Sequence, residues 1–307
     1  MSVLSELQYH NEEAAYAFFE AHVWRNGRVC PHCGVIDRSG PLTGKSTRIG
    51  VYKCYACRKP FTVKVGTIFE SSHVKLHIWL QAMFLLCSSK KGISSNQLHQ
   101  TLNVTLKTAW FMSHRIREAM REGKLPIGGM GGEGKFVEAD ETYVGGKARN
   151  RAYKEAPKKE PVIALVERKG RVRSFHVPNV TAANIKPILK EQLSPKSHLR
   201  TDESGVYWDA GEGFASHQTV NHSAKEYVRG DAHTNTVEGY FSILKRGIIG
   251  VYHHVNEEHL KRYLAEFDFR YNERIALGVD DVERANRALS GIVGKRLTYR
   301  TTNRARA

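Results

Sequence analysis

Three acidic residues and one lysine are the side chains of this sequence best suited to metal-dependent chemistry. They are Asp140, Asp202, Glu238 and Lys245. Cleavage or transfer of a phosphodiester with two Mg²⁺ ions needs oxygen ligands around metals about 3.5 to 4 Å apart, one activating the nucleophile and one stabilising the leaving oxygen. Carboxylates are ligands that Mg²⁺ prefers, and a lysine can hold a phosphate beside them. Because acids on strands and helices are usually solvated, the hypothesis requires these side chains to converge.

The first two acids lie on predicted strands. Residues 135–144 alternate between apolar and polar side chains, with Glu138 and Asp140 on the polar face, which predicts a half-buried strand. Residues 197–205 are typical of a short strand that ends in a Ser-Gly turn. Asp202 lies at the carboxyl end of that strand, where open sheets place their sites.

The third acid and the lysine lie on a predicted helix. Apolar residues recur at helical spacing across residues 235–246, and Asn235 or Thr236 is suited to cap the start of this helix. Lys245 follows Glu238 by seven positions, which is about two turns at roughly 3.6 residues each. Both side chains are therefore expected to point the same way.

Longer motifs around these residues resemble those of one known family. Thirty-five residues separate Asp202 from Glu238, a spacing familiar from retroviral integrases. Together with the runs 137–147 and 233–254, this spacing resembles that of the ISXO-type insertion-sequence transposases, and the resemblance extends from the cysteine pairs to Asn272. Some members of that group have Asn or His in place of the third acid, whereas this chain keeps Glu238.

The resemblance implies a ribonuclease H-like catalytic core. In that core Asp140, Asp202 and Glu238 would be ligands of two Mg²⁺ or Mn²⁺ ions, and Lys245 would contact a phosphate or a DNA end. We also assign the neighbouring Arg246 to DNA binding. Because two transposon ends must be paired, the resemblance further implies a homo-oligomer on double-stranded DNA.

Four of the five cysteines form two closely spaced pairs. They are Cys30 with Cys33 and Cys54 with Cys57, in two Cys-x-x-Cys motifs separated by twenty residues. This spacing predicts a closed, tetrahedral, structural Zn²⁺ site made by two knuckles. A disulfide or redox pair is the competing interpretation. We expect His32 to face solvent, and Cys87, which lies in an apolar helix, to belong to the core.

A helical region is predicted between the cysteines and the acids. Residues 75–88 have one apolar side, and residues 93–120 read as two short helices joined by a turn near residues 102–104. This is the pattern of a helix-turn-helix, whose second helix enters the major groove. The residues expected to contact DNA are Thr105, Lys107 and Thr108. Three helices also occur as a plain packing unit, which is the alternative.

The composition favours a polyanionic partner. The chain has 47 Lys and Arg against 31 Asp and Glu, a formal net charge of +16, and such charge promotes phosphate contacts and counterion release. The amino terminus lacks a signal-peptide pattern, and the longest apolar stretch, 78–87, is shorter than the roughly 20 residues of a membrane helix. We therefore expect a cytoplasmic, nucleoid-associated protein that is not membrane-bound.

The predicted fold class is α/β, a ribonuclease H-like mixed sheet with flanking helices, preceded by a small zinc ribbon and a helix-turn-helix. Within the core we predict a hairpin at 161–177, a helix at 181–193, a strand at 217–221, a helix at 257–274 and a basic loop at 145–159. The predicted domains are an amino-terminal helix and zinc ribbon (1–72), the helical DNA-binding region (73–127), a glycine-rich linker (128–134), the catalytic domain (135–275) and a basic tail (276–307).

These features predict a DNA transposase that cuts insertion-sequence ends and transfers the 3′-hydroxyl to target DNA. Three alternatives remain open. A catalytically silent DNA-binding regulator would have the same amino-terminal features. A structure-selective nuclease would cut without joining. A serine or tyrosine recombinase would form a covalent intermediate, for which Tyr143, Tyr207, Tyr252 and Ser242 are available.

Overall fold

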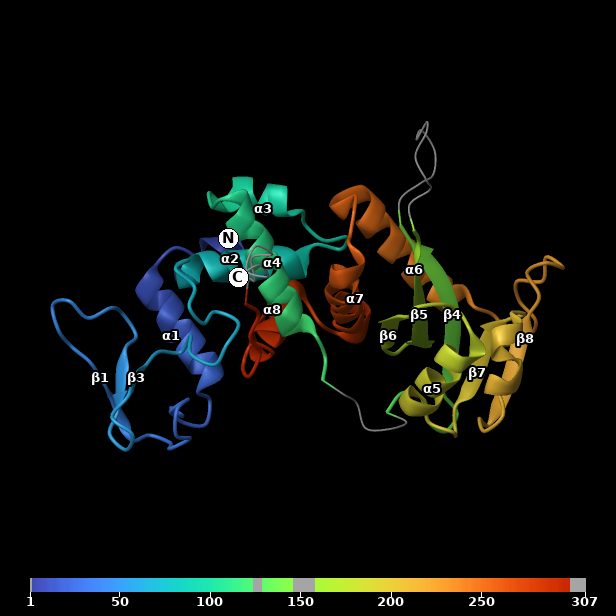
Figure 1. Cartoon of the computed structure of the whole chain (residues 1–307), viewed down its shortest axis with the longest axis horizontal. Helices are drawn as coiled ribbons and strands as arrows, with labels where there is room; N and C mark the ends of the chain where they lie inside the picture. The colour runs from blue at the N-terminus through green and yellow to red at the C-terminus, as the bar shows by residue number, and fades with distance from the viewer. Residues whose placement is uncertain (1, 124–128, 146–157, 299–307) are drawn as a thin grey trace, which may run out of the picture. The chain divides into compact units, whose positions relative to one another are not determined.

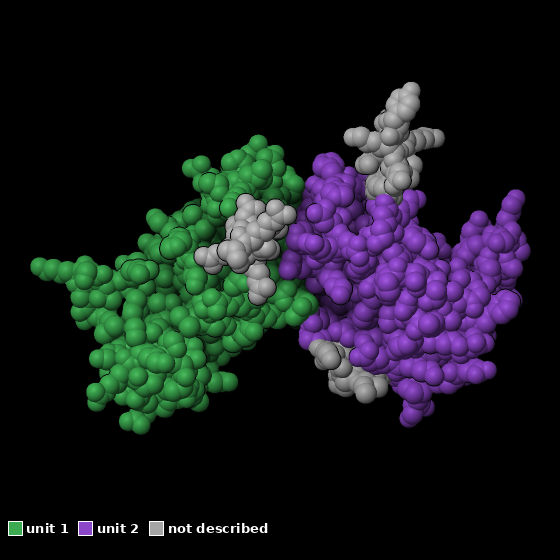
Figure 2. Space-filling view, viewed as in Figure 1, with its two compact units in different colours: residues 1–121, 279–307 green, residues 122–278 purple. Residues whose placement is uncertain are grey.

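The structure, a computed structural model, describes residues 2–123, 129–145 and 158–298 (Figure 1). The chain forms two compact units (Figure 2). Unit 1 contains Met1–Arg121 and Val279–Ala307, and unit 2 contains Glu122–Gly278. The chain therefore leaves unit 1 once and returns to it after unit 2 is complete.

Unit 1 begins with two 3₁₀ turns, Val3–Ser5 and Leu7–Tyr9, and the helix α1, Glu12–Val23. The side chain of Asn11 accepts the N–H of Ala14 and so caps α1. A three-stranded antiparallel sheet follows, in the order β1-β2-β3. Its strands are β1 Ser39–Pro41, β2 Tyr52–Cys54 and β3 Pro60–Phe61. Strands this short bury little apolar surface, so additional cross-links are needed to hold the ribbon together.

Four helices form the rest of unit 1. They are α2 Leu76–Ser88, α3 Ser95–Leu102, α4 Leu106–Met120 and α8 Asp281–Ser290. Side-chain oxygens of Ser94 and Thr105 accept N–H groups in the first turns of α3 and α4. Asn103, with φ of +50°, turns the chain between these two helices in the left-handed region that Asn tolerates. The predicted helices and the turn near 102–104 are therefore present.

Helix α8 differs from the prediction of a basic tail at 276–307. It buries Ala288 and Leu289 and packs against α2 and α4 within unit 1. After the helix, the ammonium of Lys295 donates to the backbone carbonyls of Ala119 and Arg121 at 2.9 and 2.6 Å. Apolar residues at helical spacing, Ala285, Ala288 and Leu289, account for the helix. Residues 299–307 lie outside the described part of the chain.

Unit 2 is built on a mixed five-stranded sheet with the strand order β6-β5-β4-β7-β8 (Figure 1). Its strands are β4 Phe136–Val144, β5 Glu160–Glu167, β6 Val172–His176, β7 His198–Asp202 and β8 Ser216–Val220. Neighbouring strands β4, β5 and β6 pair antiparallel, whereas β4 pairs parallel with β7, and β7 with β8. The predicted α/β class, mixed sheet, hairpin and short strands are confirmed.

Helices cover both faces of this sheet. One face carries α5 Ala182–Gln192 and the 3₁₀ helix η3 Gly205–Ala210. The other carries α6 Asn235–Gly247, the π-helical turn η4 Ile248–Tyr252 and α7 Glu257–Asn272. Strand β5 shows why two layers are needed, since Ile163 packs towards α5 and Ala164 towards α6. Burying such aliphatic side chains contributes about 1.5–3 kcal/mol each. A short 3₁₀ turn, Ile275–Leu277, follows α7.

The central strand β4 is buried on both faces, which corrects the prediction of a half-buried strand. Val137 and Ala139 are fully buried in the core beneath α5. Glu138, predicted to lie on the polar face, is also fully buried. The sheet places β4 in its middle, so the first half of the strand is covered on both faces, the polar Glu138 included.

The glycine-rich segment 128–134 does not behave as a simple linker in its described part. Met130 is buried, forms a parallel bridge with Leu193, and exchanges backbone hydrogen bonds with Gln192 and Ser194 at 2.9 and 2.8 Å. Gly131 has φ of +77°, and a Cβ there would lie 2.1 Å from the Ser197 hydroxyl, so glycine is required. The segment is anchored in unit 2.

Two remaining predictions concern a basic loop in unit 2 and the absence of a membrane-spanning helix. The basic loop predicted at 145–159 falls mostly outside the described residues, which stop at Gly145 and resume at Lys158. Among the helices that the structure describes, none combines the length and the apolar composition needed to cross a membrane.

Candidate metal centres

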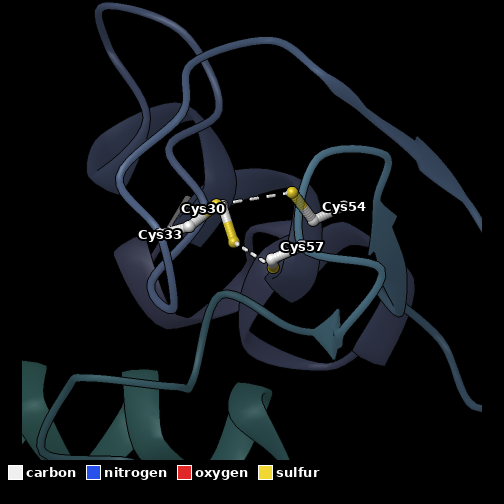
Figure 3. Close-up of side chains that lie close together, drawn as sticks. All are labelled: Cys30, Cys33, Cys54 and Cys57. Carbon is white, nitrogen blue, oxygen red and sulfur yellow. Dashed lines mark hydrogen bonds between the residues drawn. The ribbon is translucent and has the colours of Figure 1, made fainter.

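The two cysteine pairs come together in unit 1 (Figure 3). The sulfur of Cys30 lies 3.7 Å from that of Cys57, and the sulfur of Cys33 lies 3.7 Å from that of Cys54. All four sulfur atoms lie within 4.8 Å of one another. After each pair the chain turns through a left-handed residue, Gly34 at φ +74° and Arg58 at φ +59°. Each knuckle thereby directs both of its thiols at the same point.

The chemistry of this cluster supports a structural zinc. None of the five cysteines, all of which lie in the described part of the chain, forms a disulfide. Backbone N–H groups of Cys57 and Ala56 lower the pKa of the Cys54 thiol to about 7, whereas burial and hydrogen bonds with the other three thiols raise the pKa of the Cys33 thiol to about 11. A bound cation such as Zn²⁺ would hold both as thiolates. The ring nitrogen Nε2 of His32 lies 3.2 Å from the carbonyl of Pro60. This cluster is formed by four cysteines, as predicted, without His32.

In unit 2 the strand register explains why the first two acids approach each other. Strands β4 and β7 are parallel, and Glu138 pairs with Arg200. Asp140 and Asp202 each lie two residues beyond that pair, on neighbouring strands. Because side chains alternate along a strand, both acids lie on the same face as Glu138. That face carries α6.

Glu238 reaches this location from the first turn of α6. The hydroxyl of Thr234, the residue before the helix, donates to Glu238 Oε1 at 2.8 Å. The carboxylate remains about half exposed. Lys245 and Arg246 are in the last turn of the same helix, and Arg246 donates to the Ser242 hydroxyl at 2.9 Å.

An open hollow of ≈ 410 Å³ collects most of these side chains. Its lining residues are Asp140, Glu141, Thr142, Glu238, Phe241, Ser242, Lys245 and Arg246. Four residues selected from the sequence therefore line one hollow. Asp202 is not among its described lining residues, although its charge contributes to raising the pKa of Asp140.

The acids repel one another in the absence of a cation. Burial, together with the nearby charges of Glu141, Asp202 and Glu238, raises the pKa of Asp140 to about 7. Burial also raises the pKa of Asp202. Bound divalent cations relieve such repulsion. Among the described residues, however, the oxygens of the three predicted acids do not gather within 4.8 Å as the cysteine sulfurs do, so the acids form an open cluster.

Sequence reasoning missed the positions of His222 and Glu203 beside the acids, and it named Tyr207 only as a possible nucleophile. His222 Nε2 lies 3.6 Å from Glu238 Oε1, and the His222 charge lowers the pKa of Asp202. Glu203 accepts the backbone N–H of His222 at 2.8 Å. Tyr207, fully buried, donates to Glu141 at 2.6 Å. Their contacts join positions far apart in the sequence, so only the fold reveals these roles.

A second polar cluster in unit 2 has a simpler explanation. Glu160, His176 and Glu257 have ligand-type atoms within 4.8 Å of one another. The Lys158 ammonium, however, lies 3.2 Å from Glu160 Oε1 and 3.1 Å from Glu257 Oε2. This lysine therefore already forms ion pairs with both carboxylates.

The residues predicted to contact DNA in unit 1 lie at the start of α4. Thr105 is the capping residue of α4, and its hydroxyl lies 2.8 Å from that of Thr108. Lys107 is exposed, and it lines a hollow of ≈ 300 Å³ together with Thr108 and the loop Ser71–Val74. The hydroxyls of Thr105 and Thr108 are engaged with each other and in the helix cap, which leaves exposed Lys107 as the best of the three candidates for DNA contact.

Two of the alternative nucleophiles are engaged elsewhere. Tyr207 is fully buried, and burial raises its pKa well above the usual value. The hydroxyl of Tyr252 donates to Glu266. Both hydroxyls are therefore poorly suited to form a covalent intermediate.

Comparisons with known proteins agree with this division of the chain. A family model described as an ISXO2-like transposase domain matches residues 131–272, which contain the three acids and Lys245. A model described as a transposase zinc-ribbon domain matches residues 10–60, which contain the four cysteines.

Two relatives carry similar descriptions. One, from Halobacterium salinarum, is described as an uncharacterized protein in transposable element ISH50. It is 29% identical over 264 residues, which cover 80% of this chain and 86% of the relative. The other, from Haemophilus influenzae, is described as an uncharacterized transposase-like protein. It is 29% identical over 104 residues, 34% of this chain and 83% of the relative.

Proposed function

Because the chain belongs to the ISXO2-like transposase family, we propose that it cuts the ends of an insertion sequence and transfers each freed 3′-hydroxyl to target DNA. The observation that carries this proposal is the single hollow that contains Asp140, Glu238, Lys245 and Arg246. The carboxylates of this hollow can bind metal ions, and its lysine and arginine can bind an anion. A DNA phosphate suits both, because it is an anion that also binds metal ions.

The proposed fold of unit 2 is ribonuclease H-like. This fold requires three antiparallel strands followed by a helix, a strand, a helix, a strand and a helix. Elements β4 to α6 support the proposal because they follow that order, with the short 3₁₀ helix η3 between β7 and β8. The three acids then lie on the central strand, at the end of its parallel neighbour and on the first helix after the sheet.

In the proposed mechanism, Asp140, Asp202 and Glu238 hold two Mg²⁺ or Mn²⁺ ions. Such ions supply an activated nucleophile and stabilise the leaving oxygen in an in-line displacement. Thr234 orients Glu238 through its hydroxyl. Lys245 and Arg246, on the same helix, bind phosphates of the DNA backbone at the edge of the hollow. No side chain has to form a covalent bond to DNA.

Unit 1 is proposed to select and bind double-stranded DNA. Helices α3 and α4 form the proposed helix-turn-helix, with Lys107 and Thr108 in the first turn of its second helix. One structural Zn²⁺ holds the zinc ribbon together, because its strands β1, β2 and β3 are too short to form a stable sheet by themselves. We propose that two or more copies act together on paired ends at the nucleoid.

The test combines purified protein, Mg²⁺, a labelled duplex from the DNA flanking its own gene and a supercoiled target plasmid, with Asp140→Asn alongside. The proposal predicts metal-dependent joining by the wild type only. Sequence-specific binding without cleavage would support a silent DNA-binding regulator instead. Cleavage without joining would support a nuclease.

A further inference from the structure

Glu138 is a buried carboxylate in unit 2 with an unusually complete set of hydrogen-bond donors. Its exposed fraction is 0%. One oxygen, Oε2, accepts the backbone N–H groups of Thr236 at 2.7 Å and Val237 at 3.0 Å. The other, Oε1, accepts the Thr236 hydroxyl at 2.9 Å and Nε of Arg168 at 2.6 Å. A buried carboxylate is costly unless it is paired and hydrogen-bonded, and here both oxygens are satisfied.

These bonds make Glu138 the cap of helix α6. The first N–H groups of a helix have no partner within the helix, and the helix dipole favours a negative charge there. Thr234 occupies the usual capping position but makes no capping bond. Its hydroxyl donates to Glu238 instead. Glu138 therefore leaves Thr234 available to orient the third acid.

Arg168 links Glu138 to the residues that precede helix α6. Besides its 2.6 Å bond to Glu138, Arg168 donates through Nη2 to the carbonyl of His233 at 3.0 Å. The helix start is thus held from both sides of Thr234. These hydrogen bonds join the central strand β4, the turn after β5 and the amino terminus of α6.

We propose that Glu138 is a positioning residue that fixes Glu238 relative to Asp140. Asp140 follows Glu138 by two residues on the same strand face, and Glu238 follows Val237 directly on α6. Only a short stretch of backbone separates this anchor from either acid. The inference rests on the proposed function, because it assigns Glu138 to the support of the proposed metal site.

The experiment compares Glu138→Gln with a matched control, Glu266→Gln, in the full chain with its cysteine cluster loaded with Zn²⁺. Glu266 is equally buried in unit 2, but it pairs with Arg270 within helix α7. Glutamine keeps the size of Glu138 while its amide NH₂ faces one of the donors around the site. Two properties are measured: thermal unfolding without added divalent metal, and the Kd of Mn²⁺ by calorimetry.

We expect Glu138→Gln to weaken Mn²⁺ binding by about 10- to 100-fold, the usual effect of removing a group that orients metal ligands. Glu266→Gln should bind Mn²⁺ as the wild type does, at a comparable loss of thermal stability. Wild-type Mn²⁺ affinity in folded Glu138→Gln, or an equal loss in both variants, would overturn the inference and leave Glu138 a structural residue.

Two further variants keep the result interpretable. If Glu138→Gln does not unfold cooperatively, Glu138→Asp replaces it, since it keeps the charge but shortens the reach by one methylene. It should also bind Mn²⁺ more weakly, and wild-type affinity would overturn the inference. Asp140→Asn separates this inference from the proposed function: if it binds Mn²⁺ as the wild type does, the proposed metal site itself is wrong.

Discussion

The two candidate metal centres of this chain are assembled in opposite ways. The cysteine cluster takes its four ligands from two knuckles, each spanning four residues, and its sulfurs lie within 4.8 Å of one another. The acidic cluster takes its carboxylates from β4, β7 and α6, and it opens into a hollow of ≈ 410 Å³. One centre is closed and local, and the other is open and assembled by the whole of unit 2.

This difference matches the task of each centre. Four thiolates leave a zinc ion no open position, so the ion serves to hold the ribbon. Carboxylates that stand apart leave room for water and phosphate around Mg²⁺. In our proposal the open cluster depends on the fold to hold its repelling carboxylates in place, and buried groups such as Glu138 provide part of that support. The closed cluster needs little more than its own turns.

The largest expected effect concerns chemistry at the acidic cluster. Glu238→Gln should lower DNA cleavage at least about a thousandfold, which corresponds to about 4 kcal/mol of lost transition-state stabilisation. Binding of the end duplex should not change, because the amide keeps the size of the side chain. Gel assays of cleavage and of binding measure the two properties separately. Retained strand transfer in this variant would rule out Glu238 as a metal ligand.

The next effect concerns the closed centre. Structural zinc contributes about 10–16 kcal/mol of apparent binding free energy in zinc-finger peptides, so removal of one thiolate by Cys30→Ser should weaken zinc retention at least about a hundredfold. Metal analysis after competition with a chelator measures this retention. Cys87→Ser is the matched control, since Cys87 is also buried but lies outside the cluster. Equal zinc loss in both variants would contradict the assignment.

The same contrast explains what the sequence predicted correctly. The cysteine spacing predicted the closed cluster, because both knuckles are complete within short motifs. Asp140 and Asp202 were placed on the correct strands, since alternation and a Ser-Gly turn are local signals. The cap of α6 was predicted as Asn235 or Thr236, whereas the capping group is Glu138, 98 residues away from Thr236. Long-range partners of this kind leave no local pattern.

Helix α8 shows a second limit of sequence reasoning. The segment 276–307 is predicted from its basic composition to be a tail. Its apolar residues Ala285, Ala288 and Leu289 are nevertheless buried, and Arg284 is buried with them, donating to the carbonyl of Cys87 at 3.1 Å. A charged side chain buried against distant backbone carbonyls cannot be distinguished from a solvated one in the sequence alone.

A smaller effect is expected on stability, from the buried acid Asp268, which lies in unit 2 away from the acidic cluster. Burial raises the pKa of Asp268 from 3.8 to about 6. Between these values the folded state keeps a proton that the unfolded state has lost, so the free energy of unfolding falls as pH rises from 4 to 6. The fall is at most about 3 kcal/mol at about 1.36 kcal/mol per pKa unit. Denaturant unfolding at several pH values measures it.

Asp268→Asn provides the comparison for that pH series. The amide cannot ionise, so the difference in stability between wild type and variant should change across pH 4 to 6 and remain level on either side. Asp268 accepts the N–H of Ser174 at 2.8 Å and the Tyr240 hydroxyl at 2.6 Å. The variant is therefore expected to be less stable overall. A parallel pH dependence in both proteins would show that Asp268 is not the titrating group.

The smallest effect separates phosphate contact from metal binding at the open centre. Lys245→Ala should weaken DNA binding by about tenfold or less, uniformly across sequences, and reduce the slope of log affinity against log salt by about one. Mn²⁺ affinity should not change, because an ammonium is not a metal ligand. Lys190→Ala is the matched control, since Lys190 is exposed on α5, which covers the opposite face of the sheet. If both variants had the same salt dependence, the hollow beside Asp140 would not be where phosphate binds, and the open arrangement of its acids would need another explanation.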